Sequence, residues 1–211
     1  MKRKIFIDCG AWKGTSISFF RENHPDAKDF EIYAFECHPK AQDDLRSVSN
    51  IKVIEKAVWI CGGELPFYLS LVQKDVFQEG STLIRQKITA WINRKEPVAV
   101  EGIDFSQWIK NELSPDDYII VKMNIEGAEY AVLDKMIQDK TLNYIDKLYV
   151  QWHWHKINYN EAEHQAIVDR ISSAGITLHG WELYHDGSGN FSDKWKAEFL
   201  KTLAGEDLHV N

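Results

Sequence analysis

The sequence predicts one three-layer α/β domain with a mostly parallel sheet. Short apolar runs alternate along the chain with segments in which apolar residues recur at helical spacing. Most of these runs end in polar residues or glycines, as parallel strands do where they lead into helices. The 211 residues, 44% of them hydrophobic, suffice for one full core. No repeat or linker divides them, so we expect a single domain over residues 1–211.

Composition limits the classes of function. The net charge of −7 argues against a nucleic-acid partner. No apolar run approaches the ~20 residues that span a bilayer, and the run after the basic residues 2–4 is too short for a signal peptide. Three widely spaced cysteines match neither a disulfide framework nor a zinc pattern. We therefore expect a cytoplasmic protein without a membrane partner or a bound metal.

In the N-terminal half, strands alternate with helices and are followed by a hairpin. His24-Pro25-Asp26 ends the first helix, Pro39 suits the first turn of the second, and Cys61-Gly62-Gly63 fits a hairpin turn. The expected strands are 4–8, 31–36, 51–54, 57–60 and 64–69, and the expected helices are 14–21 and 39–48.

The alternation resumes in the C-terminal half after residues 72–97. Apolar residues at helical spacing predict a substrate-side helix or lid there, with Leu83, Ile84, Ile88, Trp91 and Ile92 on its apolar face. Capping-box patterns begin helices at Asp104 and Asn160, and Gly175 ends the second of these. The other expected strands are 98–101, 118–124, 147–154 and 176–184, and the other expected helices are 127–138 and 191–203.

A glycine loop after the first strand is the first candidate site. Asp8 ends the strand, and Gly10 and Gly14 allow a sharp turn and close approach of a ligand to the backbone. Such loops bind ligands at the carboxyl edge of a parallel sheet. A dinucleotide site needs a middle glycine so that the backbone can reach a pyrophosphate, but Trp12 occupies that position. The loop is compatible instead with S-adenosylmethionine, which has no pyrophosphate.

A second acid ends the next strand. Glu36 lies 28 residues after Asp8 (36 − 8), where a carboxylate can accept hydrogen bonds from both ribose hydroxyls of an adenosyl group. The alternative is a helix-capping or solvated acid. The combination with the glycine loop favours the ribose role.

Polar residues also end a later buried strand. Asn124 and Glu126 reach the same carboxyl edge, and Glu129 lies in the first turn of the following helix. Negative charge there stabilises a helix N-terminus, which accounts for Glu129. For Glu126, this interpretation and a functional one stay equally open.

The segment 147–154 carries a candidate base. Strand alternation places Gln151, His153 and His155 on one face. A histidine suits general-base chemistry near neutral pH, which we prefer for His153, whereas a hydrogen-bonded polar residue is the preferred interpretation of His155. A metal site built from His153, His155 and Glu126 is disfavoured because Gln151 and the nearby Asn124 are neutral amides.

In these features the chain resembles the FkbM-type family of class I S-adenosylmethionine-dependent methyltransferases. The resemblance covers roughly residues 6–153 and rests on the order and spacing of four stretches: FIDCGAWKG (6–14), YAFECHP (33–39), AV with GELPFY (57–58 and 63–68) and VKMNIEGAE (121–129). It implies a Rossmann-like fold whose seven-stranded sheet has one antiparallel strand. It also implies methyl transfer to a hydroxyl of a small metabolite or sugar.

The resemblance assigns roles to individual residues. It implies that Asp8, Gly10, Ala11 and Gly14 hold the methionine part of the cofactor, that Glu36 binds the ribose, and that Ala57 and Val58 flank the adenine. Trp12, Thr15, Cys37 and Asn124 complete the expected cofactor-binding set, with Trp12 stacking on the cofactor or covering it. We expect His153 or Glu126 to take the hydroxyl proton and Asn124 to orient the acceptor.

Three positions depart from the family pattern. The family usually has Asn at position 12, Asp at position 124 and an acid at position 151, where this chain has Trp12, Asn124 and Gln151. The two amides leave open a second hypothesis, a protein that binds S-adenosylmethionine without catalysis. A nicotinamide-dependent oxidoreductase is disfavoured by the missing glycines. A nucleic-acid methyltransferase is disfavoured by the charge and by the lack of a Pro-Pro pair after Asn124.

Overall fold

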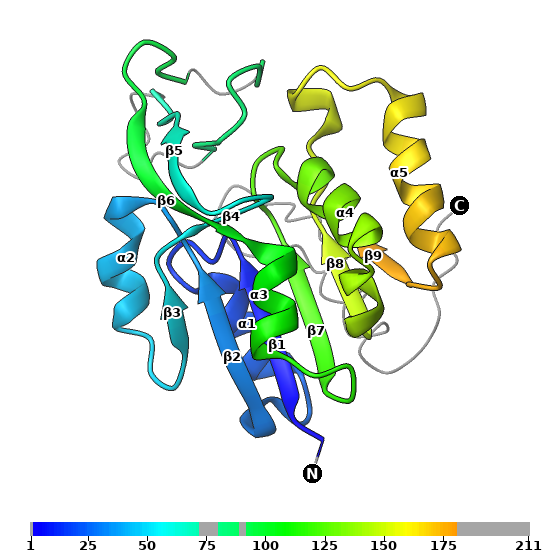
Figure 1. The fold of residues 1–211 in the computed structure, drawn as a ribbon. Coiled ribbons are helices and arrows are strands. Elements are labelled where there is room, and N and C mark those ends of the chain that lie inside the picture. The colour runs from blue at the N-terminus through cyan, green and yellow to red at the C-terminus, as the bar shows by residue number, and fades with distance from the viewer. Residues whose placement is uncertain (1, 72–79, 89–91, 181–211) are drawn as a thin grey trace.

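A computed structural model describes residues 2–71, 80–88 and 92–180 of the chain (Figure 1). Strands and helices alternate along it. The strands are β1 (Lys4–Cys9), β2 (Phe30–Phe35), β3 (Lys52–Ile54), β4 (Ala57–Trp59), β5 (Gly63–Phe67), β6 (Val98–Asp104), β7 (Tyr118–Met123), β8 (Lys147–Val150) and β9 (Leu178–Gly180). The helices are α1 (Thr15–Asn23), α2 (Pro39–Arg46), α3 (Phe105–Glu112), α4 (Glu129–Gln138) and α5 (Glu161–Ser173), with short 3-10 turns η1 (Ala27–Asp29), η2 (Thr141–Tyr144) and η3 (Trp154–Lys156).

The central sheet has six strands in the order β3-β2-β1-β7-β8-β9. Every neighbouring pair is parallel, so the carboxyl ends share one edge, toward the top of Figure 1. The chain moves outward from β1 in one direction and from β7 in the other, which makes the β1–β7 boundary the topological switch point. The predicted parallel α/β sheet is confirmed, and no antiparallel strand joins it within the described residues.

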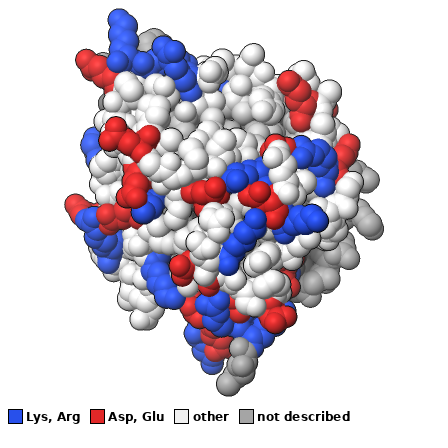
Figure 2. Space-filling model, viewed as in Figure 1, with Lys and Arg blue, Asp and Glu red and all other residues white. Residues whose placement is uncertain are grey.

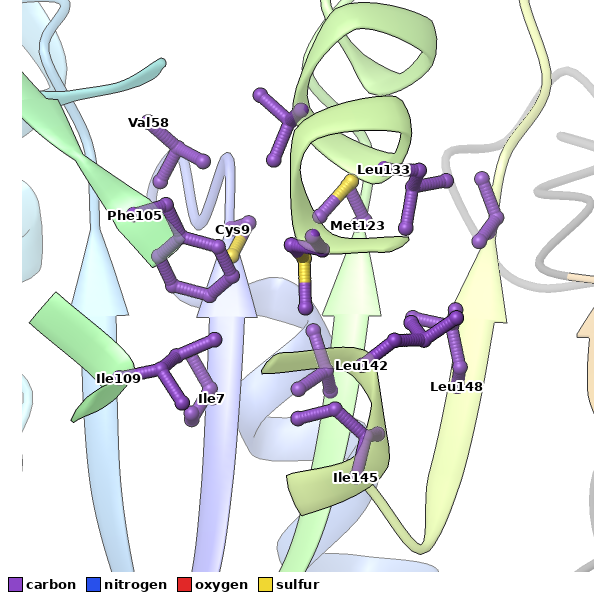
Figure 3. Close-up of a cluster of buried hydrophobic side chains, with 14 of the residues drawn as sticks. Ile7, Cys9, Val58, Phe105, Ile109, Met123, Leu133, Leu142, Ile145 and Leu148 are labelled. Carbon is purple, nitrogen blue, oxygen red and sulfur yellow. The ribbon is translucent and has the colours of Figure 1, made fainter. Parts of the chain in front are cut away.

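Helices cover both faces of this sheet, so the domain has three layers. Ile5, Ile7 and Cys9 of β1 lie in one apolar cluster with residues of α3, α4 and α5. Figure 3 shows part of this cluster, including Ile7 and Cys9 of β1, Phe105 of α3 and Leu133 of α4. Phe6 points to the other face, where it joins the cluster formed with α1 and α2. This alternation follows from the two-residue period of a strand. A strand buried on both faces is mostly apolar, as Ile5, Phe6 and Ile7 are.

A second, smaller sheet corrects the predicted hairpin. Its order is β4-β6-β5, so β4 and β5 do not pair with each other. Instead, β6 lies between them, parallel to β4 and antiparallel to β5. The residues around Cys61-Gly62-Gly63 do turn the chain, but Gly63 pairs with Gly102 of β6. The sequence suggested a hairpin because β4 and β5 are close together in the chain. Nothing in the sequence of β6 indicates that this strand inserts between them.

The predicted helix within 72–97 is wrong for the residues that the structure describes. Residues 80–88 and 92–97 form turns, bends and isolated bridges, in which Tyr68 pairs with Thr82 and Ser70 with Ile92. Ile92 is buried whereas Ile88 is exposed, so the apolar spacing does not make one continuous helix face. Trp91 lies outside the described residues.

The strand predicted at 147–154 is shorter than expected. β8 ends at Val150, and η3 begins at Trp154. Strand alternation therefore does not govern the residues that follow: His153 is buried and His155 is exposed. The late strand is described only as β9, and its expected remainder and the helix expected at 191–203 lie outside the described residues.

The predicted caps are largely confirmed. Asp104 accepts a hydrogen bond from the Gln107 backbone at 3.0 Å at the start of α3. Asn160 and Glu163 form a complete capping box at the start of α5. These bonds satisfy backbone N–H groups that a helix leaves without partners at its first turn.

The described residues also show how charge is distributed on the surface and whether a helix could span a membrane. Figure 2 shows acidic and basic side chains interspersed over the viewed face, and several of them pair, as Lys135 does with Asp104 and Asp139. Among the described residues, no helix is both long and apolar enough to cross a membrane.

Candidate functional site

The glycine loop folds back onto the end of β2. The backbone N–H groups of Gly10 and Ala11 both donate to the carbonyl of Phe35 at 3.0 Å. Gly10 has φ +79° and Gly14 has φ +84°, in the region that glycine adopts without strain. A Cβ atom on Gly10 would lie 2.0 Å from the carbonyl oxygen of Asn124. The first glycine is therefore required by the close approach of β1 to the end of β7.

Trp12 stands in this loop with φ +50°. A bulky residue rarely takes this left-handed conformation. Its ring meets His38 edge-on, with centroids 5.1 Å apart. The loop thus carries an indole where a dinucleotide-binding loop would bring bare backbone to a pyrophosphate.

Glu36 joins the loop to the segment after β2. Its Oε2 accepts from the Trp12 backbone N–H at 2.7 Å, and its Oε1 accepts from the His38 backbone N–H at 2.8 Å. The carboxyl is buried, and this burial raises its pKa against the opposing effect of the two hydrogen bonds. Each carboxylate oxygen can accept a further hydrogen bond. The residue therefore fixes the loop and still has acceptor capacity for a ligand hydroxyl.

Asp8 lies deeper than a ligand-contacting residue would. Its side chain is fully buried, and its Oδ1 lies 2.8 Å from Nζ of Lys122. Ser16 donates to its other oxygen, and Lys122 also donates to the carbonyl of Gly10 at 2.9 Å. Asp8 thus shapes the loop from below and reaches a ligand only through it.

Sequence reasoning missed Lys122 as the partner of Asp8. A signal was present, because a lysine within the apolar run Ile119–Met123 has to find a buried acceptor. Which acceptor it finds depends on β1 lying beside β7, which the sequence does not specify locally.

The remaining residues of the expected cofactor set fall into two groups. Ala11 and Gly14 are buried in the loop, and Thr15 begins α1 with an exposed side chain. Cys37 directly follows Glu36 in the chain, and it packs in the same small apolar cluster as Ala57. Val58 instead points into the main core. The structure therefore brings Cys37 and Ala57 to the Glu36 side of the loop and turns Val58 away.

A second cluster gathers at the end of β7, around Glu126. Its Oε2 lies 2.5 Å from Nζ of Lys87 and 3.8 Å from Nζ of Lys156, and its Oε1 lies 3.4 Å from Nε2 of His153. These cations outweigh the cost of burial and hold the pKa of Glu126 well below its usual range. Glu126 is thus an ionised carboxylate at neutral pH.

His153 is held between two carboxylates. Its side chain is fully buried, and its Nδ1 lies 2.8 Å from Oε1 of Glu129. Burial alone would lower its pKa, but Glu129 and Glu126 together raise it to about 9. At neutral pH the ring is therefore an imidazolium, which has no lone pair with which to accept a proton.

Glu129 stabilises the turn before α4. Its two oxygens accept from the backbone N–H groups of Ile125 at 2.9 Å and Gly127 at 2.8 Å. This agrees with the predicted stabilising charge in the first turn of the helix.

Two amides mark the carboxyl edge between β7 and β8. The Asn124 backbone donates to Cys9 and the Gln151 backbone donates to Met123, both at 2.9 Å. Asn124 Oδ1 and Gln151 Oε1 are buried atoms that accept no hydrogen bond from any described residue. Buried acceptors of this kind are costly, so they suit a ligand that brings hydrogen-bond donors. His155, by contrast, is exposed. Partial desolvation of its ring and the charge of Lys156 lower its pKa from the ordinary histidine value.

Sequence reasoning also missed Lys87 and Lys156. Lys87 exposes only 1% of its side chain and donates to the carbonyl of Gly80 at 2.6 Å. Nothing in the local sequence around either lysine indicates a buried partner. Over the described ranges, no group of three or more His, Cys, Asp and Glu side chains is arranged to hold a metal ion.

Comparison with known proteins adds a family but no activity. The model of a family described as a domain of unknown function (DUF7870) matches residues 75–182, which include β6 to β9 and the Glu126 cluster. No curated protein matches the chain. The matched stretch is 108 residues long (182 − 75 + 1), slightly more than half of the 211. The chain therefore belongs to the DUF7870 family.

Proposed function

We propose that this protein is an S-adenosylmethionine-dependent methyltransferase that acts on a hydroxyl of a small metabolite or sugar. The observation that carries the proposal is the hydrogen bond from the Trp12 backbone to Glu36. It joins the glycine loop after β1 to the acid after β2 at the carboxyl edge of the sheet. An adenosyl ligand with an amino-acid tail needs both features side by side.

The position of the loop agrees with this proposal. The loop lies at the switch point between β1 and β7, where open α/β sheets bind ligands. Asn124 presents a buried oxygen without a partner among the described residues on the same edge. The class I fold with a seventh, reversed strand belongs to the proposal as well.

The residues present suit the chemistry of methyl transfer. The cofactor would supply a methyl group already activated on a sulfonium, so alignment of the acceptor oxygen provides most of the rate. Asn124 can orient the acceptor through a hydrogen bond. Glu126 is ionised and about 20% exposed, so it can accept a hydrogen bond from the hydroxyl as the proton leaves. His153 is already protonated and does not suit the role of base.

A second candidate is a protein that binds S-adenosylmethionine without catalysis. It is favoured by the two amides, Asn124 and Gln151, where carboxylates would polarise an acceptor more strongly. It is also favoured by the low pKa of Glu126, which makes this carboxylate a weak base.

Both candidate functions require binding of the cofactor, and calorimetric titration with S-adenosylmethionine and S-adenosylhomocysteine tests this binding. We expect binding that weakens about tenfold or more in Glu36→Gln, because hydrogen bonds to a charged acceptor contribute about 1.5–3 kcal/mol. Glu64→Gln is the matched control, since Glu64 is exposed on β5, and should bind like the wild type. A thermal melt of each variant separates lost binding from lost folding.

Two further measurements decide between the classes. Tight binding of NADH in place of the adenosyl sulfonium would support the oxidoreductase and refute the proposal. If the cofactor binds, a metabolite screen with a labelled methyl donor separates an enzyme from a binding protein, because only the enzyme yields labelled product.

A further inference from the structure

The turn that leads from β7 into α4 is strained. Glu126 has φ +56° and Gly127 has φ +107°, two successive residues with positive φ. A Cβ atom on Gly127 would lie 2.4 Å from Cγ2 of Ile157, so the turn is also packed closely against the segment after η3. A backbone of this kind persists only where its surroundings hold it.

Glu129 holds the turn from one side. Its carboxylate accepts from the N–H groups of Ile125 and Gly127, which flank Glu126, and it is completely buried. A buried carboxylate needs further compensation beyond two neutral donors. The Nδ1–H group of His153 supplies it at 2.8 Å.

The other nitrogen of His153 faces Glu126 itself, at 3.4 Å from Oε1. Lys87 and Lys156 approach the second oxygen of Glu126. Among the described residues, the charged groups around the ring are Glu126 from the turn after β7, Glu129 from the start of α4, Lys87 and Lys156, with His155 farther out. Without a cation between them, the two carboxylates would repel each other in a buried site.

We propose that His153 is a positioning residue whose ring donates a hydrogen bond to Glu129 and pairs by charge with Glu126, and thereby fixes the turn 124–127 that carries Asn124. Nδ1 is hydrogen-bonded to Glu129 and Nε2 faces the Glu126 carboxylate as an ion pair, so we assign His153 an action through the turn. The description of this turn as the acceptor side of the site rests on the proposed function, whereas the bridging role of His153 does not.

A titration of labelled histidines by NMR tests the charge state directly. The ring of His153 should keep protons on both nitrogens at pH 7 and lose one only near pH 9, whereas His155 should already be neutral at pH 7. The chain has eight histidines, so the variants His153→Gln and His155→Gln each assign one of the two signals by its disappearance. A neutral His153 ring at pH 7 would overturn the proposal.

Amide hydrogen exchange tests the positioning role. In His153→Ala, the protection factors of the Ile125 and Gly127 amides should fall about tenfold or more, because each donates to a carboxylate that has lost its partner. The amides of Ile120 and Val121 inside β7 should keep their protection. His153→Gln retains one donor for Glu129 and should lie between the wild type and His153→Ala, and His155→Gln should match the wild type.

The pH dependence separates positioning from a merely structural role. Protection of the two turn amides in the wild type should fall above about pH 9, and His153→Gln should show no such step. Turn amides that stay protected in His153→Ala, or a step that survives in His153→Gln, would contradict the proposal. None of these measurements needs a cofactor, so a failed titration with S-adenosylmethionine would affect the proposed function alone.

Discussion

Nζ of Lys122 lies 2.8 Å from Oδ1 of Asp8, and the two side chains expose 2% and 0% of their surface. The pair joins β7 to β1 across the switch point of the sheet. Lys122 also holds the carbonyl of Gly10, and Ser16 of α1 donates to Asp8. One buried ion pair thus connects the first strand, the glycine loop, the first helix and the strand that brings Asn124 to the site.

Removal of this cation should strongly destabilise the protein. We expect Lys122→Met to lower the free energy of unfolding by about 3–5 kcal/mol, because it leaves the Asp8 carboxylate buried without its partner. Urea denaturation measures the change. The double variant Asp8→Asn with Lys122→Met should recover part of the loss, since it removes the unpaired charge. Lys135→Met, which removes a partly exposed surface pair, should have little effect.

Gly10 should be more sensitive to substitution than its backbone angle alone explains. Gly10→Ala combines a left-handed backbone with a Cβ atom 2.0 Å from the carbonyl oxygen of Asn124. Gly175→Ala isolates the first effect, because Gly175 has φ +83° and open space around it, and it should cost about 1–2 kcal/mol. Gly10→Ala should cost clearly more in the same urea titration and should also weaken cofactor binding. Equal losses in the two variants would show that the contact with Asn124 is unimportant.

Asn124 should contribute to ligand binding at the expense of stability. Its buried Oδ1 accepts no hydrogen bond from the described residues, so Asn124→Leu removes an unsatisfied acceptor and keeps a similar shape. We expect the free energy of unfolding to stay unchanged or to rise by up to ~1–3 kcal/mol, while calorimetry shows weaker binding of S-adenosylmethionine. A large loss of stability would mean that the amide has a structural partner.

The stability of the protein should fall at alkaline pH because of His153. Its pKa is raised to about 9 in the folded state and lies near 6.5 in an unfolded chain. Its contribution is therefore fully present below about pH 6.5 and is lost as the pH rises through 9. The total change is on the order of 3 kcal/mol. Unfolding measured from pH 6 to pH 10 should show this loss in the wild type and not in His153→Gln, whereas His155→Gln should behave like the wild type.

The sequence predicted the order of most elements and the position of the loop. Apolar runs located β1, β2, β7 and β8, because strands buried on both faces are mostly apolar regardless of what they pair with. Turn and capping residues such as Asp104 and Asn160 located helix starts, because these signals act within a few residues. The same local character explains the errors: β8 was extended to residue 154 through an apparent alternation that the backbone does not follow.

The site was predicted only in part. Glycines and acids at the ends of apolar runs indicated the Gly10 loop and Glu36, and the structure joins them through Trp12. The prediction that His153 is a base rested on the ordinary pKa of histidine and stays a prediction, and the two carboxylates that face the ring raise that pKa to about 9. The pairing of Lys87 with Glu126 was not predicted, because the segment around Lys87 was expected to form a helix or lid and no local pattern marked the lysine as buried.

By itself the sequence determined the α/β alternation, the sharp turn at Gly10 and the acids at the carboxyl ends of two strands, because each depends on residues close together in the chain. Only the tertiary structure decided that β6 separates β4 from β5, that Lys122 pairs with Asp8 across 114 residues, and that His153 lies between Glu126 and Glu129. The physical reason is that strand pairing and the charge of a buried group depend on neighbours that the folded chain brings together from distant positions.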